Sequence, residues 1–253
     1  MKTTGIAAIV TGGASGLGGA VVDSLTAAGA RVSIFDLNQE SGMTKAAQCG
    51  AHFVAVDVTA EDDVERAIES AAARHGTARI LVNCAGIGPP AKVIGRDGSA
   101  LSLTDFTRIV SINLCGTFNV LSKFAARLHR VPLEGEERGV IINTASVAAF
   151  DGQIGQAAYA ASKGGIVAMT LPIAREMARH AIRVMTIAPG IFLTPLLQSL
   201  SQEIRDSLGA QVPFPARLGK PAEFAQLVQS IIGNPMLNGE TIRLDGAIRM
   251  APK

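Results

Sequence analysis

The feature of this sequence that most limits its fold is an alternation of short apolar runs with longer amphipathic segments. The short runs are rich in Val and Ile and are apolar at both odd and even positions, as in strands that are covered on both faces. They lie at residues 6–10, 32–35, 53–56, 80–82, 140–143, 184–187 and 241–244. Between them, apolar residues recur every three to four positions, as in helices. These helical segments are residues 17–28, 61–75, 103–130, 157–180 and 221–233.

This alternation predicts an α/β chain with a parallel sheet, right-handed crossovers and helices on both faces. No Pro/Ser-rich linker, repeat or low-complexity stretch divides the 253 residues, so we expect a single domain over 1–253. Two segments break the alternation: residues 86–101, rich in Gly and Pro, and residues 190–219 within the last crossover. Each is either a plain surface loop or a lid over a substrate.

The composition excludes several classes of protein. Hydrophobic residues make up 48% and charged residues 17%, which suits a buried core and not a disordered chain. A net charge of +2, one Tyr and no Trp offer neither a basic stripe nor an aromatic platform for nucleic acid. The cysteines (Cys49, Cys84 and Cys115) form no CxxC pair and the four histidines no HxxxH pair, so no disulfide framework or metal site is predicted.

The sequence also predicts where the protein works. No apolar stretch of about 18 residues is free of charges or turn breaks, so no membrane span is expected. The first apolar run leads straight into a glycine-rich turn, which is not how a signal or transit segment ends. We therefore expect a cytoplasmic protein, or one of the mitochondrial matrix if the source is eukaryotic.

A glycine-rich turn, TGGASGLG at residues 11–18, joins the first strand to the first helix. Gly12 permits a tight exit from the strand, Gly16 removes a Cβ where a pyrophosphate approaches, and Gly18 lets the helix pack on the sheet. The helix N-terminus presents N–H groups to phosphate. Glycine clusters are common in turns, but this strand–turn–helix context predicts a dinucleotide site that includes Ser15 and Leu17.

The second strand ends at Asp36, which bears on the choice of cofactor. A carboxylate there can accept hydrogen bonds from both ribose hydroxyls of adenosine and would repel a 2′-phosphate. Leu37 and Asn38 supply no cation to hold such a phosphate. The sequence thus predicts NAD(H) over NADP(H), the alternative being that Asp36 only forms a surface turn.

Further candidate residues follow the third and fourth strands. Asp57 and Val58 follow the third, where a carboxylate can meet the adenine amine. In NCAG (residues 83–86), Cys84, Ala85 and Gly86 are small enough for a flat ring to lie against the backbone. Cys84 alone is better explained as a small buried residue than as a nucleophile. All these positions share the carboxyl edge of the sheet, where open parallel sheets bind ligands.

The fifth strand delivers Ser146 to the same edge, and Tyr159 and Lys163 follow within YAASK. Residues i and i+4 share a helix face, so the ammonium can stabilise a phenolate and lower the Tyr pKa from about 10 toward the working pH. Ser146 can bond the same substrate oxygen, which predicts a general acid/base for an alcohol–ketone pair. YxxxK alone is often a plain helix face, but this chain contains no other Tyr.

Together, TGGASGLG, NCAG, Asn113, Ser146, YAASK and the Pro-Gly pair at 189–190 resemble the short-chain dehydrogenase/reductase family over nearly the whole chain. The resemblance implies a Rossmann fold with a doubly wound seven-stranded sheet in the order 3-2-1-4-5-6-7. It implies that Asn113 is a fourth catalytic residue, whose main chain holds a water linking Lys163 to solvent. Tyr159 and Lys163 would also contact the cofactor, Lys163 through the nicotinamide ribose. The implied carboxamide-holding residues are Pro189, Gly190, Ile191, Phe192 and Thr194.

A narrower resemblance, over residues 139–178, 182–197, 212–219 and 237–250, is to the type II 3-hydroxyacyl-CoA dehydrogenases, also described as type 10 17β-hydroxysteroid dehydrogenases. It implies an NAD-dependent homotetramer that oxidises (S)-3-hydroxyacyl-CoA, with some steroid activity. Gln153 can then bond the thioester carbonyl or be a surface turn residue. The cations that can meet CoA phosphates or simply be solvated are Lys92, Arg96 and Arg217.

Two other functions stay open. One is a dehydrogenase of a different small molecule: a steroid, a sugar alcohol or a 3-oxoacyl-carrier-protein. The other is a cofactor-binding scaffold without turnover, which the fold alone does not exclude but which the presence of both Tyr159 and Lys163 disfavours.

Overall fold

Seven parallel strands form one sheet in this computed structural model, which describes residues 1–252 apart from the side chain of Leu196. The order is β3-β2-β1-β4-β5-β6-β7, which confirms the expected doubly wound α/β fold. The strands are β1 (Ala7–Thr11), β2 (Arg31–Asp36), β3 (His52–Ala55), β4 (Ile80–Asn83), β5 (Gly139–Thr144), β6 (Ile182–Pro189) and β7 (Thr241–Leu244). Because the winding direction reverses between β1 and β4, a crevice opens at their carboxyl ends.

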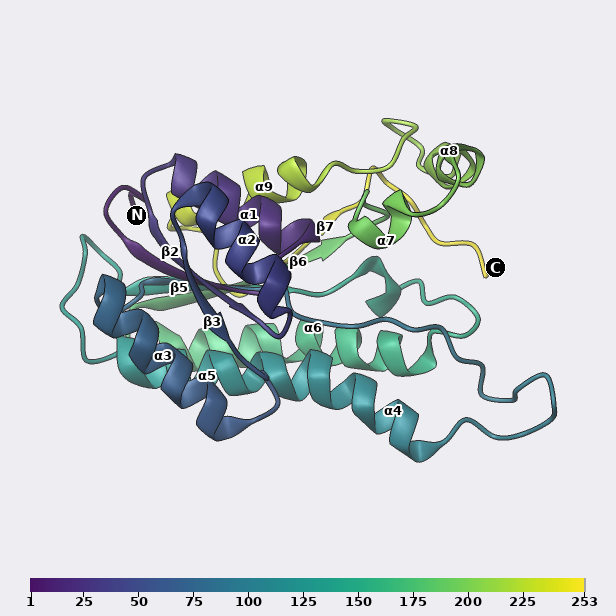
Figure 1. Ribbon diagram of the computed structural model, residues 1–253, viewed down its shortest axis with the longest axis horizontal. Coiled ribbons are helices and arrows are strands. Elements are labelled where there is room, and N and C mark those ends of the chain that lie inside the picture. The colour runs from purple at the N-terminus through teal and green to yellow at the C-terminus, as the bar shows by residue number, and fades with distance from the viewer. Residues whose placement is uncertain (253) are drawn as a thin grey trace.

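Helices cover both faces of the sheet (Figure 1). One layer contains α1 (Gly16–Ala27), α2 (Gln39–Cys49) and α9 (Pro221–Gly233). The opposite layer contains α3 (Glu61–His75), α4 (Leu103–Val110), α5 (Gly116–Leu128) and α6 (Ala157–Ala178). Two short helices, α7 (Pro195–Gln198) and α8 (Gln202–Ala210), lie near the carboxyl edge of the sheet.

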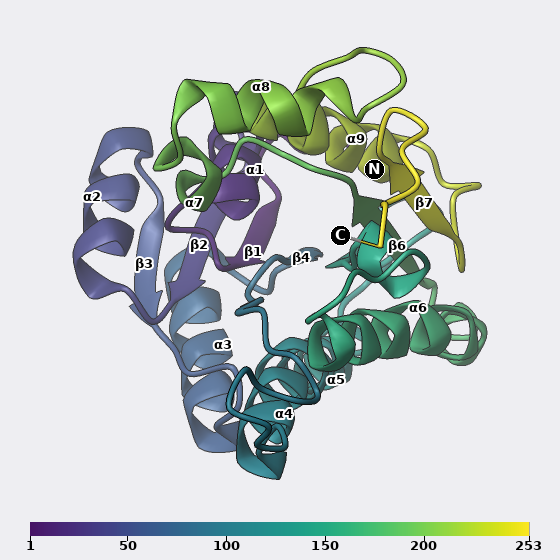
Figure 2. The same cartoon turned by 90° about the vertical axis from the view of Figure 1, so that its right-hand side faces the viewer.

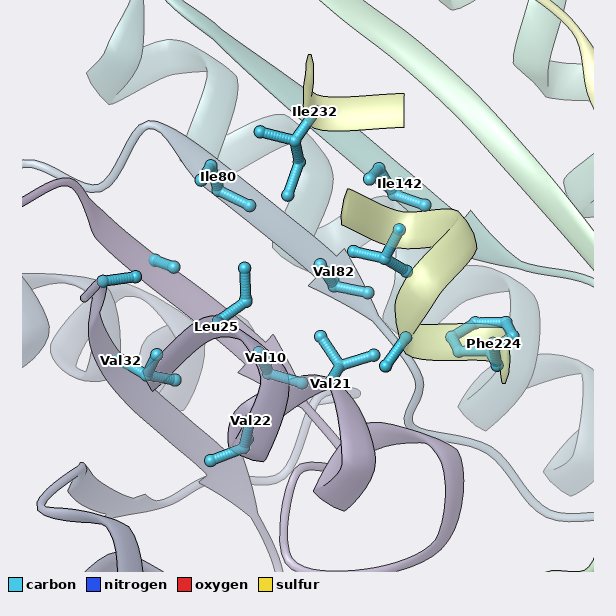
Figure 3. Packing of buried hydrophobic residues seen from close by; sticks show 14 of the residues in the cluster. Val10, Val21, Val22, Leu25, Val32, Ile80, Val82, Ile142, Phe224 and Ile232 are labelled. Carbon is cyan, nitrogen blue, oxygen red and sulfur yellow. The ribbon is translucent and has the colours of Figure 1, made fainter. Parts of the chain in front are cut away.

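The core is divided by the sheet because successive strand residues point to opposite faces. On one face, Val10, Val82 and Ile142 pack with residues of α1 and α9, such as Leu25 and Phe224 (Figure 3). On the other face, the intervening strand residues pack with α3 and α5; this cluster includes Ile9, Leu81, Ile141, Val64 and Phe124. The strands are therefore apolar at both odd and even positions, because each face of the sheet is covered by its own layer of helices.

Three helices and one irregularity of the structure do not follow from the sequence pattern. Of the residues of α2, only Gly42 and Ala46 are buried, so α2 has no apolar stripe to reveal it. Residues 190–219, expected to be irregular, contain α7 and α8. The expected single helix over 103–130 is α4 and α5 joined by a π-helical turn, Ser111–Cys115, which leaves no mark on the apolar periodicity.

One helical segment bears on the expectation that no apolar stretch of about 18 residues is free of charges or turn breaks. Leu103–Leu128 is long and apolar enough to cross a membrane by length and composition, with a mean hydropathy of 1.3, although charges such as Lys123 interrupt it. In the structure, however, Val120, Leu121, Phe124 and Leu128 of this segment lie in the core against the sheet. Such burial is the ordinary reason for apolar composition in a central helix.

A buried ion pair ties the end of α9 to the sheet at its amino edge. Arg183 on β6 donates its Nε to Glu137 Oε2 at 2.7 Å and its Nη atoms to the carbonyls of Ile231 and Ile232 at 2.9 and 3.1 Å. The two charged side chains are only 7% and 8% exposed. Burial alone would raise the pKa of Glu137, but hydrogen bonds from Arg183 and from the Met1 amino group outweigh it and hold the pKa below its ordinary value.

We predict that Arg183→Met lowers the free energy of unfolding by about 3–5 kcal/mol, because it leaves a buried carboxylate without its main partner. Urea denaturation measures this. The folded-state pKa of Glu137 is depressed, so the pair contributes its full stabilisation to the wild type above the unfolded-state pKa of about 4.3. This contribution is lost as the pH falls through the folded-state pKa. The control Arg66→Met breaks an exposed pair with Asp63 and should cost less than about 1 kcal/mol. Equal losses in the two variants would contradict the prediction.

Candidate active site

The glycine turn is packed too closely for side chains. A Cβ on Gly12, whose φ is +63°, would lie 2.7 Å from the backbone nitrogen of Ala85, and one on Gly18 would lie 2.2 Å from the carbonyl oxygen of Gly12. Gly16 has a φ of +57° and faces Pro195 at the start of α7. The Ser15 side chain makes no cap hydrogen bond to α1, which leaves the first N–H groups of this helix available to an anion.

Asp36 lies beside this turn, where the sequence placed it. Its Oδ2 accepts a hydrogen bond from the Ala14 N–H and its Oδ1 one from the Asn38 N–H, both at 3.0 Å. The carboxylate is thus fixed against the glycine turn, and each oxygen keeps a lone pair for a ribose hydroxyl. A close-packed glycine turn, a free helix N-terminus and a fixed carboxylate together fit a dinucleotide.

The ends of β3 and β4 complete the floor of this crevice. Asp57 Oδ1 accepts from the backbone N–H and the hydroxyl of Thr59, at 2.9 and 2.7 Å, and Val58 is buried. The Thr11 hydroxyl accepts from the N–H groups of Cys84 and Ala85 at 3.1 and 3.2 Å, which joins β1 to β4.

Burial raises the pKa of the Cys84 thiol to about 11, although a hydrogen bond from Thr144 and the charge of Lys163 oppose the shift. A thiol with this pKa stays protonated and is a poor nucleophile. Cys84 therefore fits the interpretation as a small buried residue.

Ser146, Tyr159 and Lys163 come together at the carboxyl edge. Ser146 follows β5, and its side chain acts on the phenol of Tyr159, on the first turn of α6, in the direction that favours the phenolate. Lys163 is 5% exposed; its Nζ donates to the Thr144 carbonyl at 2.8 Å and lies 5.8 Å from the centre of the Tyr159 ring. The i, i+4 spacing thus brings the ammonium to the phenol, as the sequence predicted.

The pKa values of Tyr159 and Lys163 are both shifted by burial, and the Tyr159 shift is opposite to the expected one. Burial raises the pKa of Tyr159, and Ser146 only partly opposes this. Burial also lowers the pKa of Lys163 to about 8. The expected fall in the Tyr159 pKa is therefore not found for the chain by itself, because the cost of burying a phenolate is larger than the opposing effect of Ser146. The phenol is protonated near neutral pH and can donate a proton.

Asn113 lies in the π-helical turn, a feature often found at functional sites. Its Oδ1 accepts from the Ile87 N–H at 2.8 Å, and its Nδ2 donates to the Ile87 carbonyl at 2.8 Å and to the Ser162 hydroxyl at 3.0 Å. Its own carbonyl accepts from the Thr117 hydroxyl at 2.6 Å. The side chain thus fastens the loop after β4 to α6, a contact that the sequence did not reveal.

Three further residues contact the catalytic group. A Cβ on Gly88 would lie 3.1 Å from the Tyr159 ring, so the loop crosses closely over the phenol. The Ser162 hydroxyl donates to the Tyr159 carbonyl at 2.7 Å, and the Thr144 carbonyl holds Lys163. The second glycine of GIGPP and the serine of YAASK were visible in the sequence, but their partners depend on how β4 and α6 pack.

The segment after β6, expected to hold the carboxamide, lies beside β7 and the glycine turn, but the Phe192 side chain is buried in the core. Gly190 donates its N–H to the Leu244 carbonyl at 2.9 Å, and Thr194 lies beside Gly16. Phe192, however, is 7% exposed and packs under Gly219 within the core. Its side chain is therefore part of the hydrophobic core, which leaves its main chain to line a ligand at this edge. Ile191 is partly buried beside it.

The candidate substrate residues lie apart from one another. The Gln153 amide donates to the Ala251 carbonyl at 2.9 Å. Gln153 also lines a cavity of about 410 Å³ with Lys92, Val93 and Ile154. Arg217 is bound by both oxygens of Glu223, which lowers the Glu223 pKa to about 2 and neutralises the arginine charge. Arg96 is exposed, and residues 1–252 contain no cluster of three metal-binding side chains.

Figure 2 looks onto the carboxyl edge. The helices α7 and α8 border it on one side, the loop of residues 86–101 lies on the side of α4, and the C-terminal segment runs toward the middle of the view. The two segments that broke the sequence pattern thus border the same edge of the sheet.

Comparison with known proteins agrees with this geometry. Residues 6–205 match the profile of the short chain dehydrogenase family. The 3-hydroxyacyl-CoA dehydrogenase type-2 of Homo sapiens is 54% identical over 252 residues, covering 98% of this chain and 97% of that protein. A crystal structure of 3-hydroxyacyl-CoA dehydrogenase type-2 from Mycobacterium avium is 44% identical, with a TM-score of 0.94 and 98% of both chains covered. A 3-ketoacyl-(acyl-carrier-protein) reductase from Brucella melitensis complexed with NADH is 29% identical, with a TM-score of 0.86 over 98% of this chain and 100% of that one. The chain therefore belongs to the short-chain dehydrogenase family.

Proposed function

We propose that this protein is an NAD-dependent dehydrogenase that interconverts (S)-3-hydroxyacyl-CoA and 3-oxoacyl-CoA. The observation that carries the reaction type is the Tyr159 phenol, which has Ser146 and the buried Lys163 beside it. This group lies at the same sheet edge as the glycine turn and Asp36. Relatives named 3-hydroxyacyl-CoA dehydrogenase type-2, matched over almost the whole chain, support the substrate class.

In ketone reduction, Tyr159 donates its proton to the carbonyl oxygen while Ser146 donates a hydrogen bond to the same oxygen. In alcohol oxidation, Tyr159 accepts the hydroxyl proton as a phenolate. When bound, the nicotinamide supplies or accepts the hydride. Lys163 stabilises the phenolate and binds the nicotinamide ribose, and Asn113 positions the loop after β4 and holds the water that reaches Lys163.

The cofactor-binding residues share the carboxyl edge. Asp36 binds the adenosine ribose, and the positive end of α1 binds the pyrophosphate. The set proposed to hold NAD comprises Gly12, Ser15, Gly16, Leu17, Gly18, Asp36, Asp57, Val58, Cys84, Ala85, Gly86, Tyr159, Lys163, Pro189, Gly190, Ile191, Phe192 and Thr194, with Phe192 acting through its main chain.

The substrate enters between residues 86–101 and 190–219, which we propose as lids. Val93 and Ile154 give the cavity beside α6 an apolar wall for an acyl chain, and Lys92 adds a cation. Gln153 can bond the thioester only by leaving the Ala251 carbonyl. The homotetramer and the cytoplasmic location stay predictions; size-exclusion chromatography with light scattering tests the first.

The substrate class is tested by NADH oxidation with acetoacetyl-CoA, a 3-oxosteroid and a 3-oxoacyl-carrier-protein. We expect the highest kcat/KM for acetoacetyl-CoA. A preference for the carrier-protein substrate would favour the activity named for the Brucella melitensis structure, and a preference for the steroid would also overturn the proposal.

We predict that Tyr159→Phe lowers kcat by about 10²–10⁴-fold, because the proton donor is lost while the ring remains. Cofactor binding, measured by NADH fluorescence, should stay within about twofold of the wild type. Leu171→Ala, a partly exposed change elsewhere on α6, serves as a control and should keep full turnover. Near-normal activity of Tyr159→Phe would show that another group transfers the proton.

The Asp36 carboxylate should make the enzyme prefer NADH over NADPH by about 100-fold or more in kcat/KM, because the carboxylate repels the 2′-phosphate of NADPH. Replacing Asp36 with Ser and Leu37 with Arg should remove most of this preference. Steady-state kinetics with both cofactors at one ionic strength measure it. A wild type that prefers NADPH would contradict the assignment.

The pKa of Lys163, lowered to about 8 by burial, predicts a pH dependence. Below that pH the ammonium is charged and available to the ribose and the phenol; above it the charge is lost. The kcat/KM for NADH, which reports the free enzyme, should therefore be level from pH 6 to about 8 and fall above it. A profile that stays level through pH 9.5 would show that Lys163 keeps its proton or is not needed.

A further inference from the structure

A charged cluster with no part in the proposed chemistry lies at the carboxyl end of β7. Arg243 on β7 donates to both oxygens of Asp151, at 2.5 and 3.4 Å, and its Nε donates to Asp245 Oδ2 at 2.8 Å. The guanidinium carbon lies 5.1 Å from the centre of the Phe150 ring. Arg243, Asp151 and Asp245 are 21%, 17% and 8% exposed. We call these four residues the Arg243 cluster.

The cluster fastens the C-terminal segment to residues 150–154. Arg243 Nη2 donates to the Ile248 carbonyl at 3.0 Å. Gln153 Nε2 donates to the Ala251 carbonyl at 2.9 Å, and the Ile154 N–H donates to the Pro252 carbonyl at 3.0 Å. The two segments therefore run side by side at the carboxyl edge, where Figure 2 shows the end of the chain.

Residues 150–154 are the middle of the segment that joins Ser146 to Tyr159. At its start, the Ser146 hydroxyl accepts from the Ala148 N–H at 3.1 Å. Gly152, Gln153 and Ile154 line the cavity beside α6. A shift of this segment would move the wall of that cavity and leave Tyr159 and Lys163 in place, because both are carried by α6.

We propose that Arg243 is a positioning residue that fixes residues 150–154 as the substrate-side wall of the site. The inference rests on the proposed dehydrogenase function, which makes this wall the surface that meets the acyl-CoA. Arginine suits the position because one planar group can bind two carboxylates and a carbonyl while its face lies on an aromatic ring. A lysine ammonium has three donors but no planar fork, so it cannot bind one carboxylate bidentately, reach the second carboxylate and lie flat on the ring at once.

The cluster also contacts the cofactor side of the site. A Cβ on Gly190 would lie 3.0 Å from Asp245, so Asp245 abuts the turn after β6. The exposed Arg249 shares Asp245, at 3.3 Å, and preserves part of its charge balance when Arg243 is changed. The contact between Arg243 and Asp151 is therefore the one that acts on substrate, and a substitution of Asp151 can remove it while the contact with Asp245 remains.

The test compares Arg243→Lys and Asp151→Ala with the wild type in NADH-dependent reduction of acetoacetyl-CoA. We expect the KM for acetoacetyl-CoA to rise about tenfold in each variant, while kcat and the KM for NADH stay within about twofold, the pattern of lost ground-state binding. The double variant should be no worse than the more affected single variant, because both changes break one contact. Either single variant suffices if the other does not fold.

Arg183→Lys is the matched control. It alters the other arginine–carboxylate pair, at the amino edge, and should lower the melting temperature while leaving both KM values unchanged. Unchanged substrate KM in Arg243→Lys and Asp151→Ala, or equal changes in the substrate KM, the NADH KM and kcat, would overturn the proposal. If the wild type reduces a different ketone of the panel, the proposed substrate fails, and the same KM comparison with that ketone decides the role of Arg243.

Discussion

The buried ammonium of Lys163 beside a buried phenol is the interaction on which the rest of the site depends. Burial disfavours the charged form of each group, so it lowers the pKa of Lys163 and raises that of Tyr159. Burial destabilises each charge, but an ammonium and a phenolate side by side offset each other. Proton transfer at Tyr159 is thus tied to Lys163 remaining charged, and the Thr144 carbonyl holds it in place for that purpose.

The fold provides this pair with its surroundings through contacts between parts of the chain that are far apart in sequence. Asn113, from the π-helical turn, binds Ile87 and Ser162 and so joins the loop after β4 to the helix that carries Tyr159 and Lys163. Gly88 lets that loop pass directly over the phenol. On the cofactor side, the lack of a Cβ at Gly12 and Gly18 lets β1, β4 and α1 meet. The catalytic residues and the cofactor-side residues therefore meet at one edge of the sheet, because all the strands are parallel.

The sequence predicts those features that depend on local pattern. Strands covered on both faces are apolar at every position, the glycine turn has its own spacing, and an i, i+4 pair shares a helix face wherever the helix lies. It does not predict features that depend on distant partners. The direction of the Tyr159 pKa shift follows from burial, the inward turn of Phe192 follows from the space at Gly219, and the engagement of Gln153 with Ala251 requires residues 98 positions apart to meet. Helix α2 is not predicted from the sequence, because only Gly42 and Ala46 of its residues are buried and they form no apolar stripe.

The two arginines on neighbouring strands show why position in the sheet decides what a structural interaction does. Arg183 and Arg243 both bind a carboxylate and backbone carbonyls. Arg183 lies at the amino edge and connects β6 to α9, where a change alters stability alone. Arg243 lies near the carboxyl edge, where the loops it connects also form the walls of the site. The same kind of contact therefore contributes only to folding at one end of the sheet and to substrate recognition at the other, because the parallel strands bring all the ligand-binding loops to a single edge.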